Sequence, residues 1–196
     1  ADAALTQHLE GKWSNVRLIV ADAVQTDLAA LGRFDRIVAN LPYLISGPIT
    51  VAFLQLLRDP ATQWDRAVLM YQAEFAQRLL ASAGDDSYGR LSVHAARWTR
   101  ASKVRDVPPG SFDPPPKVDS MVVLLEPHAT PPFQVADESL WTAVVDGSFQ
   151  QRRKQMRNTV PPAAARLGID KDDAVAVLVD LGLETERPEQ VAPARF

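Results

Sequence analysis

Short apolar runs alternate with amphipathic segments along the first two-thirds of the chain. Four runs, 16–20 (VRLIV), 36–39 (RIVA), 66–70 (RAVLM) and 120–125 (SMVVLL), have the continuous apolar character of strands that are buried on both faces. The segments between them carry apolar residues at helical spacing, and helices are predicted at 48–58, 74–83 and 91–98. The alternation predicts an α/β fold with a mostly parallel sheet covered by helices.

The pattern changes after residue 127. Twelve of the fifteen prolines lie in 101–196, and the stretch 128–132 (HATPP) is typical of a linker. Helical periodicity then predicts a long amphipathic helix at 138–157, followed by shorter helices near 162–167 and 171–181. We therefore expect two domains, an α/β domain at 1–127 and a small all-α domain at 128–196.

The composition is that of an ordinary globular protein and excludes a disordered chain. Of 196 residues, 46% are hydrophobic and 23% charged, and the net charge is −3. The chain has no cysteine, which excludes disulfides and thiolate chemistry and is consistent with a reducing compartment such as the cytoplasm. Because it has only three histidines and no long apolar run, we expect no metal site and no membrane span.

The near-neutral balance hides one basic segment. Within 148–158, four cations occur without an acid: Arg152, Arg153, Lys154 and Arg157. Arg153 and Arg157 are four residues apart, so they share a face of the predicted helix. Such a segment is either an ordinary solvated surface or a set of phosphate contacts, and the run of cations without an acid favours phosphate.

The clearest candidate for chemistry is Asn40-Leu41-Pro42-Tyr43, directly after a predicted strand. Ligand sites in open α/β sheets lie at the carboxyl ends of strands. The Asn40 side-chain oxygen and the Leu41 carbonyl could accept hydrogen bonds from an aromatic amine, Pro42 would fix the turn, and Tyr43 could stack on the ring. The alternative is a plain turn in which Asn40 caps and Tyr43 packs.

A second aromatic could complete such a site. Phe112 lies in the proline-braced segment 107–122 (VPPGSFDPPPKVDSMV), just before a predicted strand. It could stack on the other face of a flipped base, since stacking of a base on an aromatic side chain contributes roughly 1–3 kcal/mol. Taken alone, the segment is more typical of a proline-rich turn.

In this order, the motifs resemble those of the ribosomal RNA adenine dimethyltransferase family. The resemblance covers essentially the whole chain, and several motifs in fixed order are far more specific than any one of them. The matching stretches are Asp22-Ala23, 40–43 (NLPY), 71–78 (YQAEFAQR), 88–93 (YGRLSV), 107–120 (VPPGSFDPPPKVDS), 149–158 (FQQRRKQMRN) and 187–191 (RPEQV).

The resemblance implies a Rossmann-like class I methyltransferase domain followed by a helical RNA-binding domain. It implies S-adenosylmethionine as methyl donor and dimethylation of two adjacent adenosines near the 3′ end of small-subunit rRNA. The implied partners are this rRNA and the pre-30S subunit, with a monomeric enzyme in the cytoplasm, no membrane and no metal.

The resemblance also implies roles for individual residues. Asn40 and the Leu41 carbonyl would orient the amino group after the turn at Pro42, and Tyr43 and Phe112 would sandwich the base. Cofactor contacts would come from Asp22, Ala23 and Asn40. RNA contacts would come from Arg90, Lys117 and the basic segment.

The chain departs from the family pattern at its start. None of its nine glycines forms a G-x-G pair, and the family's glycine-rich cofactor loop has no counterpart. We therefore expect a chain that is truncated at its N-terminus, lacks the first strand and is inactive in this form. The alternatives are a non-catalytic ribosome-assembly factor that binds RNA, an erythromycin-resistance-type 23S rRNA adenine methyltransferase, and a DNA adenine methyltransferase.

Overall fold

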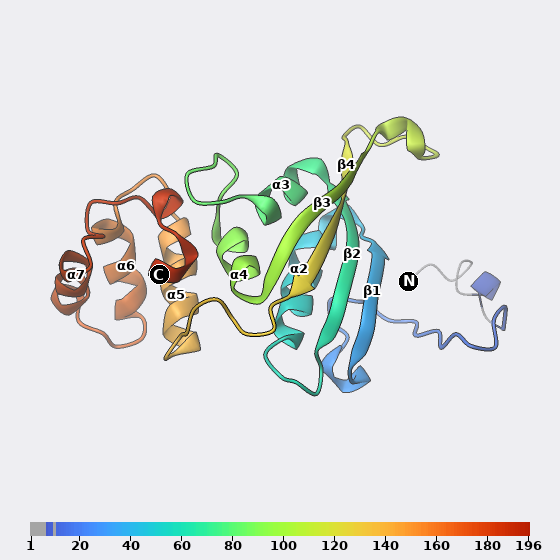
Figure 1. Cartoon of the computed structure of the whole chain (residues 1–196), viewed down its shortest axis with the longest axis horizontal. Coiled ribbons are helices and arrows are strands. Elements are labelled where there is room, and N and C mark those ends of the chain that lie inside the picture. Colours follow the sequence, from blue (N-terminus) through green and yellow to red (C-terminus); the bar gives the residue numbers. More distant parts are fainter. Residues whose placement is uncertain (1–6, 10) are drawn as a thin grey trace.

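A four-stranded mixed sheet forms the centre of the first part of the chain (Figure 1). The computed structural model describes residues 7–9 and 11–196. The strands β1 (Phe34–Asn40), β2 (Trp64–Gln72), β3 (Thr99–Val107) and β4 (Ser120–Pro127) are ordered β1-β2-β4-β3. Only β1 and β2 pair in parallel, and β4 pairs antiparallel with both β2 and β3. The expectation of a mostly parallel sheet is therefore wrong for the described residues.

Strand β3 accounts for much of this difference, and the hydrophobic pattern did not predict it. It is an edge strand whose side chains are mostly exposed and include Arg100, Lys103, Arg105 and Asp106. Edge strands carry charged side chains more readily than central strands do, so the apolar signal of a buried strand is missing. The loop 108–119 connects β3 to β4 without an α-helix, and an antiparallel pairing follows.

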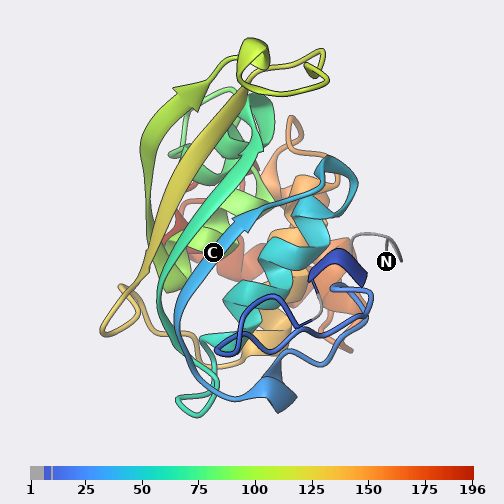
Figure 2. The same cartoon turned by 90° about the vertical axis from the view of Figure 1, so that its right-hand side faces the viewer.

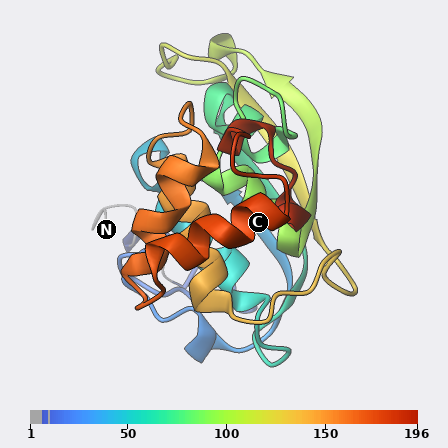
Figure 3. The same ribbon diagram turned by 90° about the vertical axis from the view of Figure 1, so that its left-hand side faces the viewer.

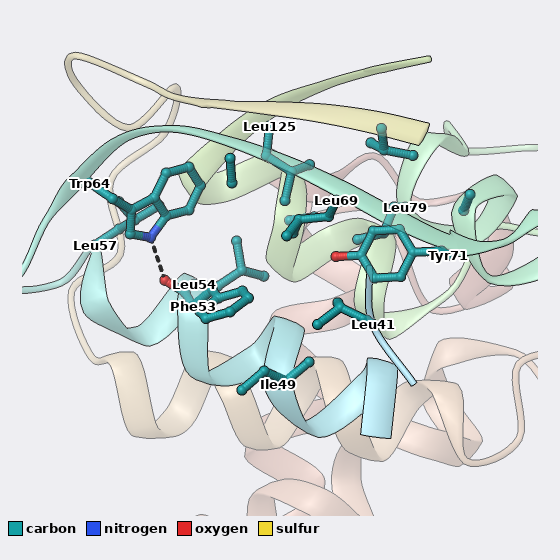
Figure 4. Close-up of a cluster of buried hydrophobic side chains, with 14 of the residues drawn as sticks. Leu41, Ile49, Phe53, Leu54, Leu57, Trp64, Leu69, Tyr71, Leu79 and Leu125 are labelled. Atoms are coloured by element: carbon teal, nitrogen blue, oxygen red, sulfur yellow. Dashed lines mark hydrogen bonds between the residues drawn. The ribbon is translucent and has the colours of Figure 1, made fainter. Parts of the chain in front are cut away.

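Three helices cover one face of the sheet and enclose the main core (Figures 1 and 2). They are α2 (Ser46–Leu56), α3 (Ala73–Leu80) and α4 (Arg90–Trp98), close to the ranges predicted from the sequence. Strand β2 contributes Trp64, Leu69 and Tyr71 to this core, all fully buried (Figure 4). The indole Nε1 of Trp64 donates to the Phe53 carbonyl over 2.8 Å and so ties β2 to α2.

The apolar run 16–20 does not form the predicted strand. Its residues are exposed and have no strand hydrogen bonds in the part of the chain that the structure describes. The outer edge of β1 likewise has no neighbouring strand there, and Val38 on this strand is 78% exposed. An isolated extended segment leaves its backbone groups to water, so the run needs a paired neighbour before its β-propensity takes effect.

The residues after the linker are helical (Figure 3). Helix α5 (Glu138–Phe149) ends eight residues before the predicted boundary, and α6 (Met156–Ala165) begins after a turn; α7 (Lys171–Asp180) is where the sequence predicted it. Two short 3₁₀ turns follow, Pro188–Gln190 and Pro193–Arg195. Within the described residues, no helix has both the length and the apolar character to cross a membrane.

Contacts from α4 and the loop before it join the two parts of the chain. The guanidinium of Arg97, only 4% exposed, donates to the Phe133 carbonyl over 2.8 Å and to the Glu138 carboxylate. On the next turn of α4, His94 Nε2 lies 3.1 Å from Asp146 Oδ1, and this hydrogen bond lowers the pKa of the Asp146 carboxyl. The two parts therefore share a packed junction, while the division at residue 127 stays a prediction.

The close approach of α5 and α6 generates a stability prediction. A Cβ at Gly147 would lie 2.3 Å from the Cβ of Ala163, so only glycine allows this spacing. We expect Gly147→Ala to lower the free energy of unfolding by about 1–3 kcal/mol, because the helices must separate. Urea unfolding would measure the change. Gly110→Ala is the matched control, because its Cβ would meet open space. Equal losses in the two variants would contradict the packing argument.

Candidate functional site

The strand register brings the ends of four strands to one edge of the sheet, the edge that runs across the strands at the carboxyl ends of β1 and β2. Asn40 at the end of β1 pairs with Met70, and two residues further along β2 Gln72 pairs with Ser120 at the start of β4. Val107 at the end of β3 also pairs with Ser120. The turn after Asn40, the start of α3 and the β3–β4 loop therefore all leave the sheet at this edge, which is where open α/β sheets place their ligand sites.

The turn that follows β1 is held by backbone contacts. Leu41 is buried, and its N–H donates to the Met70 carbonyl over 3.4 Å. The Pro42 carbonyl accepts from the Ile45 N–H over 3.1 Å and from the Ser46 hydroxyl over 3.2 Å. The proline ring fixes φ at −58° and offers no competing N–H, so the turn has one preferred path.

A set of hydroxyl groups ties this turn to β2 and β4. The hydroxyls of Tyr43 and Ser120 lie 2.9 Å apart. Behind them, Thr50 Oγ1 lies 2.6 Å from the Ser46 carbonyl, to which it donates, and 2.8 Å from the hydroxyl of Tyr71. Burial raises the pKa of Tyr71, so its phenol stays neutral and can hold this bond. The sequence analysis assigned no role to Ser120, Thr50 or Tyr71. Ser120 and Tyr71 lie within stretches that carry the family resemblance, and Thr50 lies within the predicted helix 48–58, so nothing local indicated that their hydroxyls meet.

Two hydrogen-bond acceptors remain free at the edge. Asn40 is exposed, and its side-chain amide makes no hydrogen bond within residues 7–9 and 11–196. No hydrogen bond reaches the Leu41 carbonyl there either. Both acceptors sit at a turn whose backbone is held by hydrogen bonds, two and three residues before Tyr43, which is half-buried. This arrangement can receive an N–H₂ group attached to a flat ring.

Phe112 extends from the same edge of the sheet. It follows the 3₁₀ turn Pro109–Ser111, and its N–H donates to the Pro109 carbonyl over 3.1 Å. The loop that carries it projects beyond the ends of β3 and β4 (Figure 1), and Lys117 is exposed on this loop. Within the described residues, no ring–ring contact joins Phe112 to Tyr43, so the predicted sandwich stays a prediction.

Two of the three expected cofactor contacts, Asp22 and Ala23, lie in the segment before β1, and the third, Asn40, is the last residue of β1. Asp22 and Ala23 are both exposed. The Asp22 Oδ1 accepts the Val24 N–H over 2.9 Å, and the Asp22 carbonyl accepts from the N–H and the hydroxyl of Thr26. No hydrogen bond in the described residues links Asp22 to Asn40. The exposed Asp22 and Ala23 do not by themselves enclose a group as large as a nucleoside. The expected binding role of Asp22 and Ala23 thus stays a prediction.

A cleft of about 960 Å³ begins beside this edge and runs between the sheet helices and α5. Gly47 and Phe75 line its near end, on the segments that follow β1 and β2. Its wall carries four arginines, Arg58, Arg78, Arg90 and Arg152, and three acids, Glu74, Asp86 and Asp146. The structure therefore places Arg90 in a hollow with a small excess of positive charge. In the described residues, no cluster of three His, Asp or Glu could hold a metal ion.

The basic segment is not one helix, and its four cations differ. Arg152 lies in the turn between α5 and α6 and points inward. Its Nε donates to Glu189 over 3.0 Å, its Nη1 donates to the Asp86 carbonyl over 2.8 Å, and the side chain is 39% exposed. Arg153, Lys154 and Arg157 are exposed, and no ion pair involves them in the part of the chain that the structure describes. Of the four cations of the basic segment, Arg153, Lys154 and Arg157 are therefore the ones that can contact an outside partner.

Comparisons with known proteins show the family and the fold of the chain. The family model described as "Ribosomal RNA adenine dimethylase" matches residues 2–182. The chain belongs to the ribosomal RNA adenine dimethylase family. A dimethyladenosine transferase from Plasmodium falciparum superposes with a TM-score of 0.73 at 27% identity, covering 95% of this chain and 72% of that one. The 23S rRNA methyltransferase ErmE, at a TM-score of 0.65 and 23% identity, shares the fold. The predicted Rossmann-like α/β fold is confirmed.

Relatives of this dimethylase-family chain carry related names. A "Ribosomal RNA small subunit methyltransferase A" from Thiobacillus denitrificans is 38% identical over 190 residues, which cover 94% of this chain and 70% of the relative. "Probable ribosomal RNA small subunit methyltransferase A" proteins from Methanospirillum hungatei and Halobacterium salinarum are 37% and 40% identical over 96% and 91% of this chain. The chain spans 60% of the Halobacterium protein and 72% of the Methanospirillum protein.

Proposed function

We propose that this protein is an rRNA adenine N6-dimethyltransferase that uses S-adenosylmethionine as methyl donor. The observation that carries the proposal is the pair of free acceptors at Asn40 and Leu41, on the same turn as the tethered Tyr43, in a chain from the dimethylase family. The choice of donor rests on the family, because the exposed Asp22 and Ala23 do not by themselves enclose a nucleoside.

Two free acceptors would meet what an adenine amino group requires. Its nitrogen lone pair is delocalised into the ring, which makes the group a poor nucleophile. Acceptors at Asn40 Oδ1 and the Leu41 carbonyl would each take one N–H, draw the group toward a pyramidal shape and localise the lone pair. Because both acceptors lie on a fixed turn, their positioning is completed during folding and contributes directly to rate.

The base would be held by its faces. Tyr43 would stack on one face, and stacking of a base on an aromatic ring contributes roughly 1–3 kcal/mol. Phe112, on the loop that leaves the same edge, is the proposed partner on the other face. A base reaches such a site only when it is flipped out of its stack, at a cost of a few kcal/mol that two aromatic rings can offset.

The RNA would lie along the cleft and the exposed cations. We propose phosphate contacts from Arg90 in the cleft and Lys117 on the β3–β4 loop, and from Arg153 and Lys154 before α6 and Arg157 in its first turn. Phosphate contacts carry no sequence information but fix the register of the RNA. The names of the relatives favour small-subunit rRNA, and we propose two adjacent adenosines near its 3′ end in the pre-30S subunit as the target. A cytoplasmic monomer suits this role.

Removal of the Asn40 acceptor tests the chemistry. In the full product of the gene, we expect Asn40→Ala to reduce methyl transfer by roughly 10²–10³-fold, the usual effect of losing one group that stabilises a transition state. RNA affinity should be nearly unchanged, since a single hydrogen bond is removed from a large interface. Transfer of labelled methyl groups and RNA filter binding would measure the two. Asn15→Ala, on the exposed segment before β1, is the matched control. Equal turnover in Asn40→Ala and wild type would rule out the role.

Reversal of the exposed cations tests the RNA surface. We expect Arg153, Lys154 and Arg157, changed together to Glu, to weaken RNA binding and flatten its salt dependence. The slope of log K against log salt should fall by about 0.7–0.9 for each phosphate that the protein no longer neutralises. Reversal of Arg33, Arg36 and Arg66, which pair with Asp65 and Glu126 at the other end of the sheet, changes the net charge equally and should leave the slope as it is.

The inward-facing Arg152 is a second control for the same experiment. Its replacement by Gln should lower the free energy of unfolding, because Glu189 and the Asp86 carbonyl lose their donor, without a comparable change in the salt slope. If Arg152→Gln alone flattened the slope and the triple reversal did not, our assignment of the RNA-facing cations would be wrong.

A further inference from the structure

We propose that Ser120 is a positioning residue for methyl transfer, because its hydroxyl sets the orientation of the Tyr43 ring against the target base. The inference rests on the proposed function, in which Tyr43 stacks on an adenine. It assigns a role to a strand residue that lies 77 positions away from Tyr43 in the sequence.

The anchor is among the most firmly held positions at this edge. Ser120 is fully buried, and its backbone pairs with Gln72 of β2 on one side and with Val107 of β3 on the other. The carbonyl of the preceding residue, Asp119, accepts the Ala73 N–H over 2.9 Å and so ties the strand to the start of α3. A hydroxyl on such a position has little freedom to move.

The ring that it holds would otherwise be fixed at one end only. Tyr43 begins the short 3₁₀ turn Tyr43–Ile45, and the backbone contacts of Leu41 and Pro42 hold its main chain. The ring is half-buried, and the next side chain, Leu44, is almost fully exposed. The bond of 2.9 Å between Tyr43 Oη and Ser120 Oγ is the only side-chain hydrogen bond that Tyr43 makes within the described residues. It fixes the position of Oη and therefore the direction in which the long axis of the ring points.

A merely structural serine would behave differently. In Ser120→Ala, loss of the bond leaves the phenol of the half-buried Tyr43 within reach of water, so the folded state should lose little stability. A shift of the stacking ring, in contrast, moves the base relative to the acceptors at Asn40 and Leu41. A displacement of about 1 Å at a reacting group can lower the rate by roughly 100-fold. The two roles therefore separate in the ratio of rate loss to stability loss.

The test removes the bond from each side in the full product of the gene. We expect Ser120→Ala and Tyr43→Phe each to lower kcat by about 10–100-fold, with RNA affinity close to wild type. The unfolding midpoint should stay close to wild type in Ser120→Ala, whereas Tyr43→Phe leaves the buried Ser120 hydroxyl without its partner and should lower the midpoint. The double variant should be no slower than the slower single variant, since both changes remove one shared interaction. Ser102→Ala, on the exposed face of β3, is the matched control and should keep full activity.

A second readout does not depend on methyl transfer. RNA with 2-aminopurine in place of the target adenosine lacks the 6-amino group, so it reports only on the stacking part of the site, through the fluorescence that is lost when the base stacks on an aromatic ring. We expect wild type to quench this signal, Ser120→Ala and Tyr43→Phe to quench it less, and Ser102→Ala to quench it as wild type does. If Ser120→Ala fails to fold, Tyr43→Phe removes the same bond from the more exposed side and carries the test.

Tyr43→Ala separates failure of this inference from failure of the proposed function. If Tyr43→Ala transfers methyl groups at the wild-type rate, stacking by Tyr43 is wrong and the inference fails with it. If Tyr43→Ala is inactive while Ser120→Ala and Tyr43→Phe are as fast as wild type, the stacking role stands and the positioning role is overturned. Rate losses that multiply in the double variant would also overturn it, because Ser120 would then act apart from Tyr43.

Discussion

The pairing of β2 with a strand on each side is the constraint on which the candidate site depends. β2 contributes the buried Trp64, Leu69 and Tyr71 to the core, and its register sets β1 on one side and β4 on the other. That register aligns the end of β1 with the start of β4. The acceptors of the turn after β1 and the tether of Tyr43 are therefore consequences of strand pairing, and both are fixed before any ligand arrives.

The second part of the chain is held by charged groups whose partners lie within the protein. The guanidinium of Arg97 has Trp98, Phe133 and Trp141 around it, with ring centroids at 5.0, 5.3 and 5.5 Å, and it also donates to Glu138. Arg152 similarly bonds to Glu189 and to the loop before α4. Arginine suits such junctions because its planar, always charged group can hydrogen-bond in its plane and stack on its faces. The cleft beside the junction therefore has walls held in a defined relation.

The sequence predicted what local patterns can encode. Apolar runs identified β1, β2 and β4, helical spacing identified α2, α3, α4 and α7, and a polar residue followed by proline and tyrosine identified the turn after β1. It failed where the decisive contacts are distant. The run 16–20 has strand character but no paired neighbour in the described residues, β3 is polar because it is an edge, and Arg152 turns inward toward residues 86 and 189. The bond between Tyr43 and Ser120 joins residues whose proximity only the sheet register determines.

The most direct test of the account is a mass-spectrometric map of adenosine methylation in rRNA. Small-subunit rRNA that lacks the modification would be incubated with the full product of the gene and S-adenosylmethionine, then digested and sequenced by mass. The account predicts two adjacent N6,N6-dimethyladenosines near the 3′ end, and none when Asn40→Ala replaces the wild type. RNA that is bound yet stays unmethylated, or methyl groups that appear only on large-subunit rRNA or on DNA in parallel reactions, would contradict it.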